Sequence, residues 1–547
     1  MNRDFRIRID RYVKTMVKGY VPTATGNKII HDPIWGSVVF HPWEVRLIDS
    51  PLFQRLRNIN QVGLAQSTYP AARHTRFEHS LGTAAIASRM MEQLYTESRQ
   101  RDDVRGMIGE KEIHLVRLAA LLHDLGHCPY SHLSEAVYGS MPEFISARTE
   151  LIEETKGCAS PSPHETFSYF IIVSDAFVDF FFRHVKYPHV TTKKQARELL
   201  QKAANMVIGR VNEGEDGTKY SYLTSVLNGD FDADKLDYTQ RDSYTAGIAL
   251  TYGVERFLLK LVLCKTEEKG VVDYRLGITA DALSTVEELL FNRSMLYHYM
   301  YRHQKILAAE AQMRDAVYAL VRVGYIKHPC DFLFLNNQEM SALYRSHKKP
   351  FASDGAETKT LASLMQAFSR RTLLKRAVEL SADSFEKDAD DGSLNQAVAA
   401  LNSAPSDDEK KKILQSLMEE RQNRVPYPDH VADYVQFLKD CTAEQSIAER
   451  KIIAARIAEE YERAGKPVDF DAFDLALSFQ PPLETKLSLT VVDKQHRPLE
   501  GTVAIDRITE WTKAFNRSKW RGYLFVAPHV DRALAEKAFL NYLNEKQ

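Results

Sequence analysis

The feature that most constrains the fold is the wide spacing of four side chains able to bind a metal: His79, the adjacent pair His123 and Asp124, and Asp234. The adjacent pair ends the apolar run 114–125, inside L-L-H-D-L-G-H. Consecutive helical side chains diverge by about 100°, so both can reach an ion against that helix end. His79 and Asp234 need two further helices, so one divalent first-row ion would join three distant segments. The His-Asp pair alone is also compatible with a hydrogen-bonded core pair.

The composition indicates a soluble globular chain with a sizeable core. Of its 547 residues 44% are hydrophobic, the mean hydropathy is −0.35, and the formal net charge of −1 provides no global basic field for nucleic acid. The N-terminus lacks the apolar stretch of a signal peptide, and no apolar run approaches the length of a membrane span, so no membrane partner is expected. Five scattered cysteines, none in C-x-x-C, indicate a reduced, cytoplasmic chain: Cys128, Cys158, Cys264, Cys330 and Cys441.

The hydrophobic pattern predicts a mainly α chain. A strand at 37–40 and a helix at 42–58 precede helical patterns from 76 to about 325, interrupted by a hairpin strand at 271–278 and ending in one helix from 280 to about 323. The stretch 381–412 is polar and typical of a mobile loop. After Pro481-Pro482, the runs K-L-S-L-T-V-V, G-T-V-A-I and G-Y-L-F-V-A-P predict strands, and 532–544 a helix. We therefore expect a catalytic core at 1–330, a helical region at 331–480, and a small α+β module at 481–547.

Histidines concentrate around the metal-binding pair. His127 lies one helical turn after His123, His132 follows the Cys128-Pro129 break, and His164-Glu165 follows a loop rich in serine and proline. The whole chain has only 18 histidines, so packing alone does not explain this density. A His-Asp dyad beside glycine in H-D-L-G-H-C-P-Y-S-H, with basic residues nearby, indicates hydrolysis of a phosphate ester.

Several ordered motifs resemble the SAM-and-HD-domain deoxynucleoside triphosphate triphosphohydrolases and their bacterial relatives. They are H-D-P-I-W-G, H-P-W-E-V-R-L-I-D-S-P-L-F-Q-R-L-R-N-I-N-Q-V-G, R-F-E-H-S-L-G, H-D-L-G-H-C-P-Y-S-H, D-A-D-K-L-D-Y-T-Q-R-D-S and N-R-S-M-L-Y-H-Y-M-Y-R-H-Q-K. The resemblance covers roughly residues 28–320, and more weakly F-S-R-R-T-L-L-K at 368–375. We expect the catalytic core alone, because too few residues precede Lys28 for a SAM domain. The implied fold is mainly α, an HD-domain helical bundle with small β-hairpins and the C-terminal α+β module.

The resemblance implies metal-dependent hydrolysis of a deoxynucleoside triphosphate (dNTP) to deoxynucleoside and inorganic triphosphate. The metal ligands would be His79, His123, Asp124 and Asp234, which do not distinguish Mn, Fe, Mg, Zn and Ni. His132 would be the general acid, because imidazole titrates near neutral pH. Glu135 stands where relatives have aspartate, and its extra methylene would shift the donor by about an ångström. His164 and Glu165 would support His132, with His127 near the phosphates.

The same resemblance implies the substrate contacts. The triphosphate would lie against Arg76, Lys235, Tyr238 and Arg293. Gln61 and Asp242 would bind the 3'-hydroxyl, Tyr301 would exclude a 2'-hydroxyl, and Tyr297 stands where relatives often have histidine. Plainer explanations remain open. Arg76 and Glu78 could form a surface ion pair, Tyr238 and Tyr301 could be core aromatics, and Asp242 could pair with Arg241 or cap a turn.

Relatives assemble into tetramers whose interfaces bind activating nucleotides, so we expect a homo-oligomer (tetramer or dimer) and activation by GTP or a dNTP. The matching residues are Lys28, Asp49, Gln54, Arg57, Arg370, Arg371 and Lys375, although Q-R-L-R is also typical of a solvated helix face. Two other functions stay open: an HD-type phosphodiesterase or nuclease acting on nucleic acid or a signalling nucleotide, and a non-catalytic oligomeric nucleotide sensor. Nucleotide balance and antiviral defence against phage are equally compatible roles.

Overall fold

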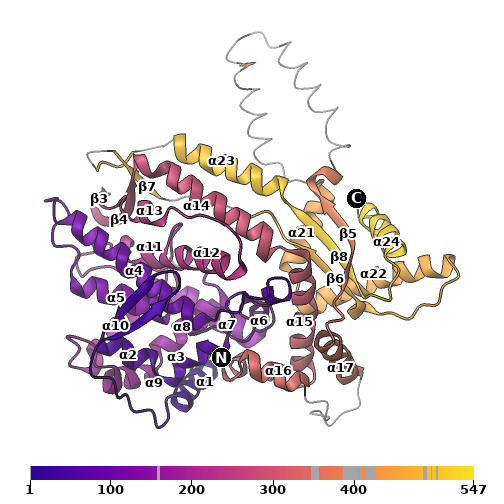
Figure 1. The fold of residues 1–547 in the computed structure, drawn as a ribbon, viewed down its shortest axis with the longest axis horizontal. Helices are drawn as coiled ribbons and strands as arrows, with labels where there is room; N and C mark the ends of the chain where they lie inside the picture. The colour runs from indigo at the N-terminus through magenta and orange to yellow at the C-terminus, as the bar shows by residue number, and fades with distance from the viewer. Residues whose placement is uncertain are drawn as a thin grey trace. The chain divides into compact units, whose positions relative to one another are not determined.

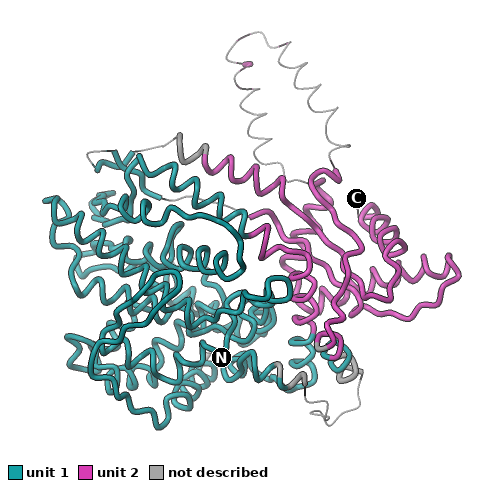
Figure 2. The backbone as a smooth tube through the Cα atoms, in the orientation of Figure 1, with its two compact units in different colours: residues 1–296, 316–365, 487–502 teal, residues 297–315, 366–486, 503–547 magenta. Residues whose placement is uncertain are grey.

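The computed structural model describes residues 2–156, 160–345, 356–385, 427–483, 489–493, 496–499 and 503–546, with isolated positions between 386 and 426. The chain forms two compact units (Figure 2). The first comprises 1–296, 316–365 and 487–502, and the second comprises 297–315, 366–486 and 503–547. The units therefore interleave along the chain, unlike the three consecutive segments expected from the sequence. Cys158 and most of the polar stretch 381–412 lie outside the described residues.

The first unit is mainly helical, which confirms the predicted fold class (Figure 1). Helix α14 ends within the span 280–323, where the sequence predicted one continuous helix. That prediction was wrong, because a π-helical turn at Tyr297–Tyr301 separates α14 from α15. The helices of this unit are α1 (Asn2–Met16), α2 (Pro42–Ile48), α3 (Pro51–Gln54), α4 (Arg76–Ser98), α5 (Glu110–Leu122), α6 (His132–Tyr138), α7 (Pro142–Glu154), α8 (Pro163–Val173), α9 (Asp175–Phe180), α10 (Lys193–Val207), α11 (Ser221–Leu227), α12 (Ala233–Ala246), α13 (Val254–Leu258), α14 (Leu283–Leu296) and α16 (Asn337–Arg345).

Short helical turns complete this unit. The predicted helix 42–58 is broken into α2, α3 and a 3₁₀ turn, because Asp49-Ser50-Pro51 restarts the chain with Ser50 as a new N-cap. The remaining turns are 3₁₀ helices at Arg55–Asn58, Ala65–Ser67, Ala280–Ala282 and Pro329–Phe334, and a π-helical turn at Phe181–Val185. Two helices, α15 (Gln304–Arg322) and α17 (Ala356–Ser369), contribute residues to both units. No helix among the described residues is long and apolar enough to cross a membrane.

Helix α4 packs against both α5 and α12 and forms the centre of the first unit. Small residues on α4, including Gly82, Ala84 and Ala87, are buried and let the neighbouring helices approach closely. Glu78 caps α4 by accepting a hydrogen bond from the Thr75 backbone N–H at 2.9 Å. The three helices carry the metal-binding candidates at their ends, so this packing positions the site.

The first unit has two small sheets. Strands β1 (Lys28–Asp32) and β2 (Gly36–Phe40) form an antiparallel hairpin, in which Asp32 pairs with Gly36. Strand β4 (Val271–Thr279) matches the strand predicted at 271–278 and pairs with β3 (Leu261–Glu268). Strand β7 (Thr490–Val492) adds parallel to β4, so part of the predicted C-terminal module belongs to the first unit.

The second unit contains a three-stranded antiparallel sheet, ordered β5-β8-β6. Its core includes Trp520, Leu475, Val526 and Phe539, all at most 1% exposed. The terminal helix was predicted correctly at 532–544, whereas the strand predicted for G-T-V-A-I was wrong because α23 begins at Val503. The elements are β5 (Lys375–Ser381), α21 (Asp429–Asp440), α22 (Ala443–Arg463), β6 (Leu475–Phe479), α23 (Val503–Ser518), β8 (Arg521–Val526) and α24 (Arg532–Asn544), with short 3₁₀ turns at Ala382–Ser384 and Ala472–Asp474.

Candidate metal centre

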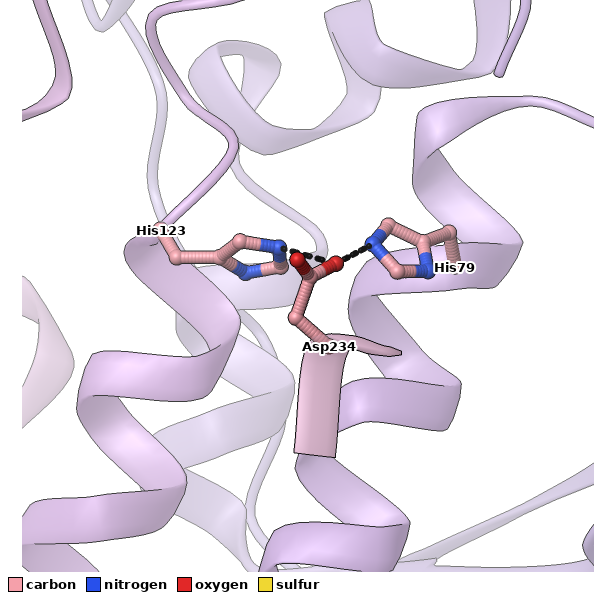
Figure 3. A group of neighbouring side chains, drawn as sticks. All are labelled: His79, His123 and Asp234. Carbon is pink, nitrogen blue, oxygen red and sulfur yellow. Dashed lines mark ion pairs between the residues drawn. The ribbon is translucent and has the colours of Figure 1, made fainter. Parts of the chain in front are cut away.

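The structure brings the four predicted metal ligands together. The Asp234 carboxylate, at the start of α12, lies between the rings of His79 on α4 and His123 at the end of α5 (Figure 3). Asp234 Oδ1 is 2.8 Å from His79 Nε2 and 3.8 Å from His123 Nε2. The Asp124 carboxylate approaches the same two Nε2 atoms, at 3.7 Å from His79 and 3.3 Å from His123. Three helices therefore meet at one point, as the spacing predicts.

The two histidine rings are oriented for a shared ion. The Nδ1 atom of His79 is 2.8 Å from Asp237 Oδ2, and that of His123 is 2.6 Å from the Ala120 carbonyl oxygen. These outer partners hold the Nδ1 proton, which leaves the Nε2 lone pair for a metal. Both Nε2 atoms are buried and lack a hydrogen-bond partner of acceptable geometry among the described residues. Two orphaned nitrogens facing two carboxylates fit a divalent cation.

Charges around the centre favour ionised carboxylates. Burial, the largest influence, would raise the pKa of Asp124, but Arg76 and the neighbouring His123 and His127 hold it well below its usual value. Arg76 Nη1 lies 3.0 Å from Asp124 Oδ2 and is itself buried, which excludes a surface ion pair with Glu78. Burial would lower the pKa of His79, yet hydrogen bonds and charges from Asp234 and Asp237 raise it to about 10.

Gly126 lets helix α8 approach the turn that follows Asp124. A Cβ atom there would lie 2.2 Å from the His164 carbonyl oxygen and 2.5 Å from the Ser168 backbone nitrogen. The Gly126 N–H also donates to Ser168 Oγ at 2.9 Å. The glycine of H-D-L-G-H therefore brings His164, near the start of α8, beside the metal centre.

A second cluster adjoins the metal centre, with Glu135 at its middle. Glu135 Oε1 lies 3.3 Å, 3.0 Å and 3.1 Å from the Nδ1 atoms of His127, His132 and His164. The His127 and His164 rings stack with centroids 3.9 Å apart. Burial would raise the pKa of Glu135, but His132 and His164 hold it well below its usual value. His127 links the clusters, because its Nε2 is 3.1 Å from Asp124 Oδ1.

Two residues with positive φ precede His132: Tyr130 at 62° and Ser131 at 53°. This backbone conformation is strained for residues other than glycine and persists only where surroundings enforce it. Here Asn337 Oδ1 accepts a hydrogen bond from the Tyr130 N–H at 3.0 Å, and Ser131 Oγ donates one to the Asn60 carbonyl oxygen at 2.6 Å. The turn starts α6 so that His132, whose side chain is 69% exposed, stands over the buried cluster.

The sugar-binding candidates lie near α4 and α12. Gln61 is buried, and its Oε1 has no hydrogen-bond partner among the described residues. Asp242 Oδ1 is 2.6 Å from His74 Nε2, so this carboxylate has a buried histidine as a partner. His74 was missed from the sequence, although it lies only two residues before the R-F-E-H motif.

The remaining substrate candidates have diverse settings. Lys235 Nζ is 2.5 Å from Asp232 Oδ2 and 2.9 Å from the Gly229 carbonyl oxygen. Its ammonium therefore lies beside Asp234 but has partners of its own. Burial would lower the pKa of Lys235, but the charges of Asp232 and Asp234 raise it, against a smaller opposing effect of Arg293 on α14. Tyr238 is half-buried on α12. Tyr297 and Tyr301 belong to the second unit, where their rings pack edge to face at 4.9 Å; their substrate roles stay predictions.

Glu165 and the regulatory candidates have local roles in the structure. Glu165 caps α8 through the Ser162 N–H at 2.6 Å and does not contact His132. Lys28 and Asp49 form an exposed ion pair at 3.2 Å, and Arg57 donates to Gln54 at 2.8 Å. The other regulatory candidates are exposed residues of the second unit, and their role stays a prediction: Arg370, Arg371 and Lys375.

Sequence reasoning missed the outer partners of the metal centre. Asp237 holds His79, and Arg241 in turn holds Asp237 with two contacts of 2.8 Å. Their spacing gave one signal, since Asp234, Asp237 and Arg241 follow each other at helical intervals of three and four residues. An adjacent charge pattern of this kind is common on solvated helix faces, so the sequence alone does not assign it.

Comparisons with known proteins agree with this geometry. Residues 76–176 match the model of the HD domain. The chain is similar to the deoxynucleoside triphosphate triphosphohydrolase SAMHD1 of Bos taurus, with 29% identity over 299 residues, 53% of this chain and 47% of the relative. The Homo sapiens protein of the same name is 26% identical over 315 residues, 57% of this chain and 47% of the relative. An uncharacterized protein of Methanocaldococcus jannaschii is 31% identical over 291 residues, 53% of this chain and 49% of the relative.

The chain thus spans about half the length of the curated relatives it matches. The matched HD segment begins at Arg76 and contains His79, His123 and Asp124, and it extends through the Glu135 cluster to His164. Residues 76–176 therefore form an HD domain, and over about half of its length the chain is similar to the SAMHD1 deoxynucleoside triphosphate triphosphohydrolases.

Proposed function

We propose that this protein is a metal-dependent hydrolase of deoxynucleoside triphosphates, which releases deoxynucleoside and inorganic triphosphate. The observation that carries the proposal is the adjacency of two clusters, a cation site and a carboxylate-backed exposed histidine, joined through His127 and Asp124. A purely structural metal site needs no proton donor beside it. The names of the relatives support a dNTP as substrate.

The chain's own residues account for the phosphate chemistry. A bound divalent ion would supply an activated water and neutralise phosphate oxygens, and its ligands would be His79, His123, Asp124 and Asp234. Arg76 is buried, and its Nη1 and Nε bond Asp124 and Ser131, so its charge is fixed beside the phosphate position. Lys235 adds a second cation next to Asp234 for the outgoing triphosphate.

His132 would donate a proton to the departing 5'-oxygen. Its Nδ1 faces Glu135, so Nε2 is the nitrogen that remains for the substrate. Its side chain is 69% exposed, which a residue meeting an incoming ligand requires. Glu135 holds the ring in place, while the buried His127 and His164 keep Glu135 fixed.

Two side chains support recognition of a free 3'-hydroxyl. The hydroxyl has one proton, and two acceptors are available for it: the unpartnered Gln61 Oε1 and the Asp242 carboxylate, which is fixed by His74. A buried amide oxygen without a partner is costly, so a ligand that satisfies it is favoured over one that does not. A phosphodiester at that position would lack this proton, which favours the mononucleotide over a nucleic acid.

Product analysis tests the proposal. The purified protein is incubated with each dNTP, with GTP, and with a short oligonucleotide, with Mn²⁺, Fe²⁺, Mg²⁺, Zn²⁺ and Ni²⁺ in turn. Inorganic triphosphate and deoxynucleoside are the expected products, and Asp234→Ala should abolish their formation without unfolding the chain. Monophosphate or shortened oligonucleotides would instead identify a phosphodiesterase or nuclease. If no substrate is turned over with any of the metals, the protein is a nucleotide sensor.

Nucleotide activation and assembly into an oligomer form part of the same proposal. The exposed Lys28-Asp49 pair and the Gln54-Arg57 pair offer cations, a carboxylate and an amide, groups suited to a purine edge and phosphates. Turnover of one dNTP should rise when GTP is added, with a change in sedimentation. Unchanged rate and unchanged mass would reject activation and leave the hydrolase proposal in place.

A further inference from the structure

We propose that Asp237 is a positioning residue of the metal centre, and that the turn of the β1–β2 hairpin holds Asp237 through Trp35, Asp32 and Arg241. The hairpin turn thereby becomes part of the apparatus that fixes His79. The inference depends on the proposed function only in assuming that His79 binds a divalent cation. It assigns a role to four buried or half-buried residues that contact neither metal nor substrate.

A continuous chain of contacts joins the hairpin to His79. Trp35 Nε1 donates to Asp237 Oδ1 at 2.5 Å, and the other carboxylate oxygen, Oδ2, lies 2.8 Å from His79 Nδ1. Arg241 grips Asp237 from a second side, with Nε and Nη2 each at 2.8 Å from the carboxylate. The Arg241 guanidinium also reaches back to Asp32 at 2.8 Å. Asp237 thus has donors on both oxygens.

The hairpin turn is built to hold these two groups. Asp32 is buried, and its Oδ1 accepts the backbone N–H groups of Ile34 at 2.8 Å and Trp35 at 2.9 Å. This Asx-type turn fixes the backbone from which the Trp35 indole projects. The same carboxylate binds Arg241 through Oδ2. Asp32 therefore binds both the turn backbone at Trp35 and the Arg241 guanidinium. We call Asp32, Trp35, Asp237 and Arg241 the relay.

Gly82 provides independent evidence that the relay is close-packed. A Cβ atom at this position of α4 would lie 1.9 Å from Asp237 Oδ1 and 2.2 Å from Arg241 Nη2. Gly82 lies three residues after His79 and thus on the same helix face. The glycine of R-F-E-H-S-L-G therefore leaves room for the Asp237-Arg241 pair to reach the helix that carries the ligand.

The relay acts on His79 in a specific way. A carboxylate at Nδ1 fixes the tautomer in which Nε2 has its lone pair, and it raises the basicity of the ring as a ligand. Arg241 and Trp35 restrict the position of the carboxylate, so the direction of the Nε2 lone pair is set by residues of the hairpin and α12. A change at the hairpin turn should therefore change the affinity for metal.

The test measures binding of Mn²⁺ alone to the chelator-treated full chain by titration calorimetry, without turnover. Asp237→Asn keeps the shape but removes the charge, and should weaken Mn²⁺ binding by about 10–100-fold. Trp35→Phe removes one hydrogen bond to Asp237 and should weaken binding by about 3–10-fold. Gly82→Ala should weaken it by displacing the pair, although it changes no polar group.

Two matched controls separate positioning from general stability. Glu44 forms a buried bidentate pair with Arg117, at 2.7 Å and 2.8 Å, that does not touch the metal ligands, so Glu44→Gln should lower stability but not Mn²⁺ affinity. Trp43 is buried and its indole nitrogen has no partner among the described residues, so Trp43→Phe removes the same atoms as Trp35→Phe without a relay contact.

Melting temperatures identify the variants that fold. If Asp237→Asn does not fold, Trp35→Phe provides the test of the relay. Weaker Mn²⁺ binding in the relay variants than in both controls supports the relay, whether or not the wild type hydrolyses a dNTP. Mn²⁺ affinities equal to those of the controls overturn it, even if turnover is lost. Failure of the relay and failure of the proposed hydrolase are therefore distinguishable.

Discussion

Replacing Gly126 by alanine tests how the HD turn is coupled to helix α8. The added Cβ would lie 2.2 Å from the His164 carbonyl oxygen, and ordinary contacts begin at 3.4 Å, so the α8 backbone must move by about 1.2 Å. The His164 carbonyl oxygen and the Ser168 backbone nitrogen, the two nearest atoms, both belong to the main chain, so no side-chain rotation relieves the overlap. Overpacking of this kind costs about 1–3 kcal/mol, partly offset by up to about 1 kcal/mol from the less flexible unfolded chain. We expect a net loss of about 1–2 kcal/mol in the free energy of unfolding.

The same displacement should affect catalysis more than stability. His164 is stacked on His127 at 3.9 Å and contacts Glu135 at 3.1 Å, so a shift of about 1 Å separates the cluster. Misplacement on this scale can cost about 100-fold in rate. Urea unfolding and dNTP turnover provide the two measurements. Gly26→Ala is the control, because a Cβ at Gly26 meets nothing within 4 Å. If the two variants behave alike, the close approach of α8 is irrelevant and the reasoning is refuted.

Three further predictions concern histidines. Burial would lower the pKa of His164, but Glu135 raises it to about 9, so Glu135→Gln should bring this pKa below its ordinary value of 6.5 in an NMR titration; an unchanged pKa would contradict the pairing. His132→Asn should leave the free energy of unfolding within about 0.5 kcal/mol and slow hydrolysis by about 10²–10⁴, because His132 is exposed. Burial and the Arg302 charge lower the pKa of His298 to about 4, so the unfolded chain takes up a proton below pH 6.5 that the folded chain refuses. Stability should therefore fall from pH 6.5 toward 4, and His298→Gln should flatten this dependence in urea unfolding; a parallel decline in both proteins would speak against it.

Local order along the chain explains what the sequence could predict. The proximity of the four candidate ligands follows from helix geometry, because His123 and Asp124 end an apolar helix and Asp234 starts another beside its cap Asp232. The terminal helix at 532–544 was also predicted correctly, since Asp531 caps it through two backbone N–H groups. In each case the signal lies within a few residues of the feature it predicts.

Features set by distant residues were missed or predicted wrongly. The run G-T-V-A-I has the β-branched residues of a strand, yet it enters α23, whose buried Ile508, Thr512 and Asn516 repeat every four residues. The partner of His79 is likewise set by tertiary contacts, because His79 and Asp237 are 158 positions apart. Strand β8 pairs with β5 and β6, which both precede residue 481, and no local pattern at 481–547 indicates these strand partners.

The charge balance around His79 gives a physical reason for a divalent ion. Two guanidinium groups and four carboxylates contact one another or the His79 ring, which leaves two negative charges if the histidines are neutral: Arg76, Arg241, Asp32, Asp124, Asp234 and Asp237. Uncompensated buried charge is costly, and a chain without metal must neutralise it by binding protons. The raised pKa of His79, about 10, is consistent with a proton held there.

Metal removal should therefore have a defined pH dependence. The folded pKa of His79 lies above its unfolded value of 6.5, so its contribution to the stability of metal-free protein is complete below pH 6.5 and is lost as the pH rises toward 10. Mn²⁺ at neutral pH must displace this proton. Calorimetry in two buffers of different ionisation enthalpy should show proton release, and the metal-loaded protein should lose less stability between pH 7 and 10. Binding without proton release, together with equal pH dependence of both forms, would mean that the four carboxylates do not act as one charged site.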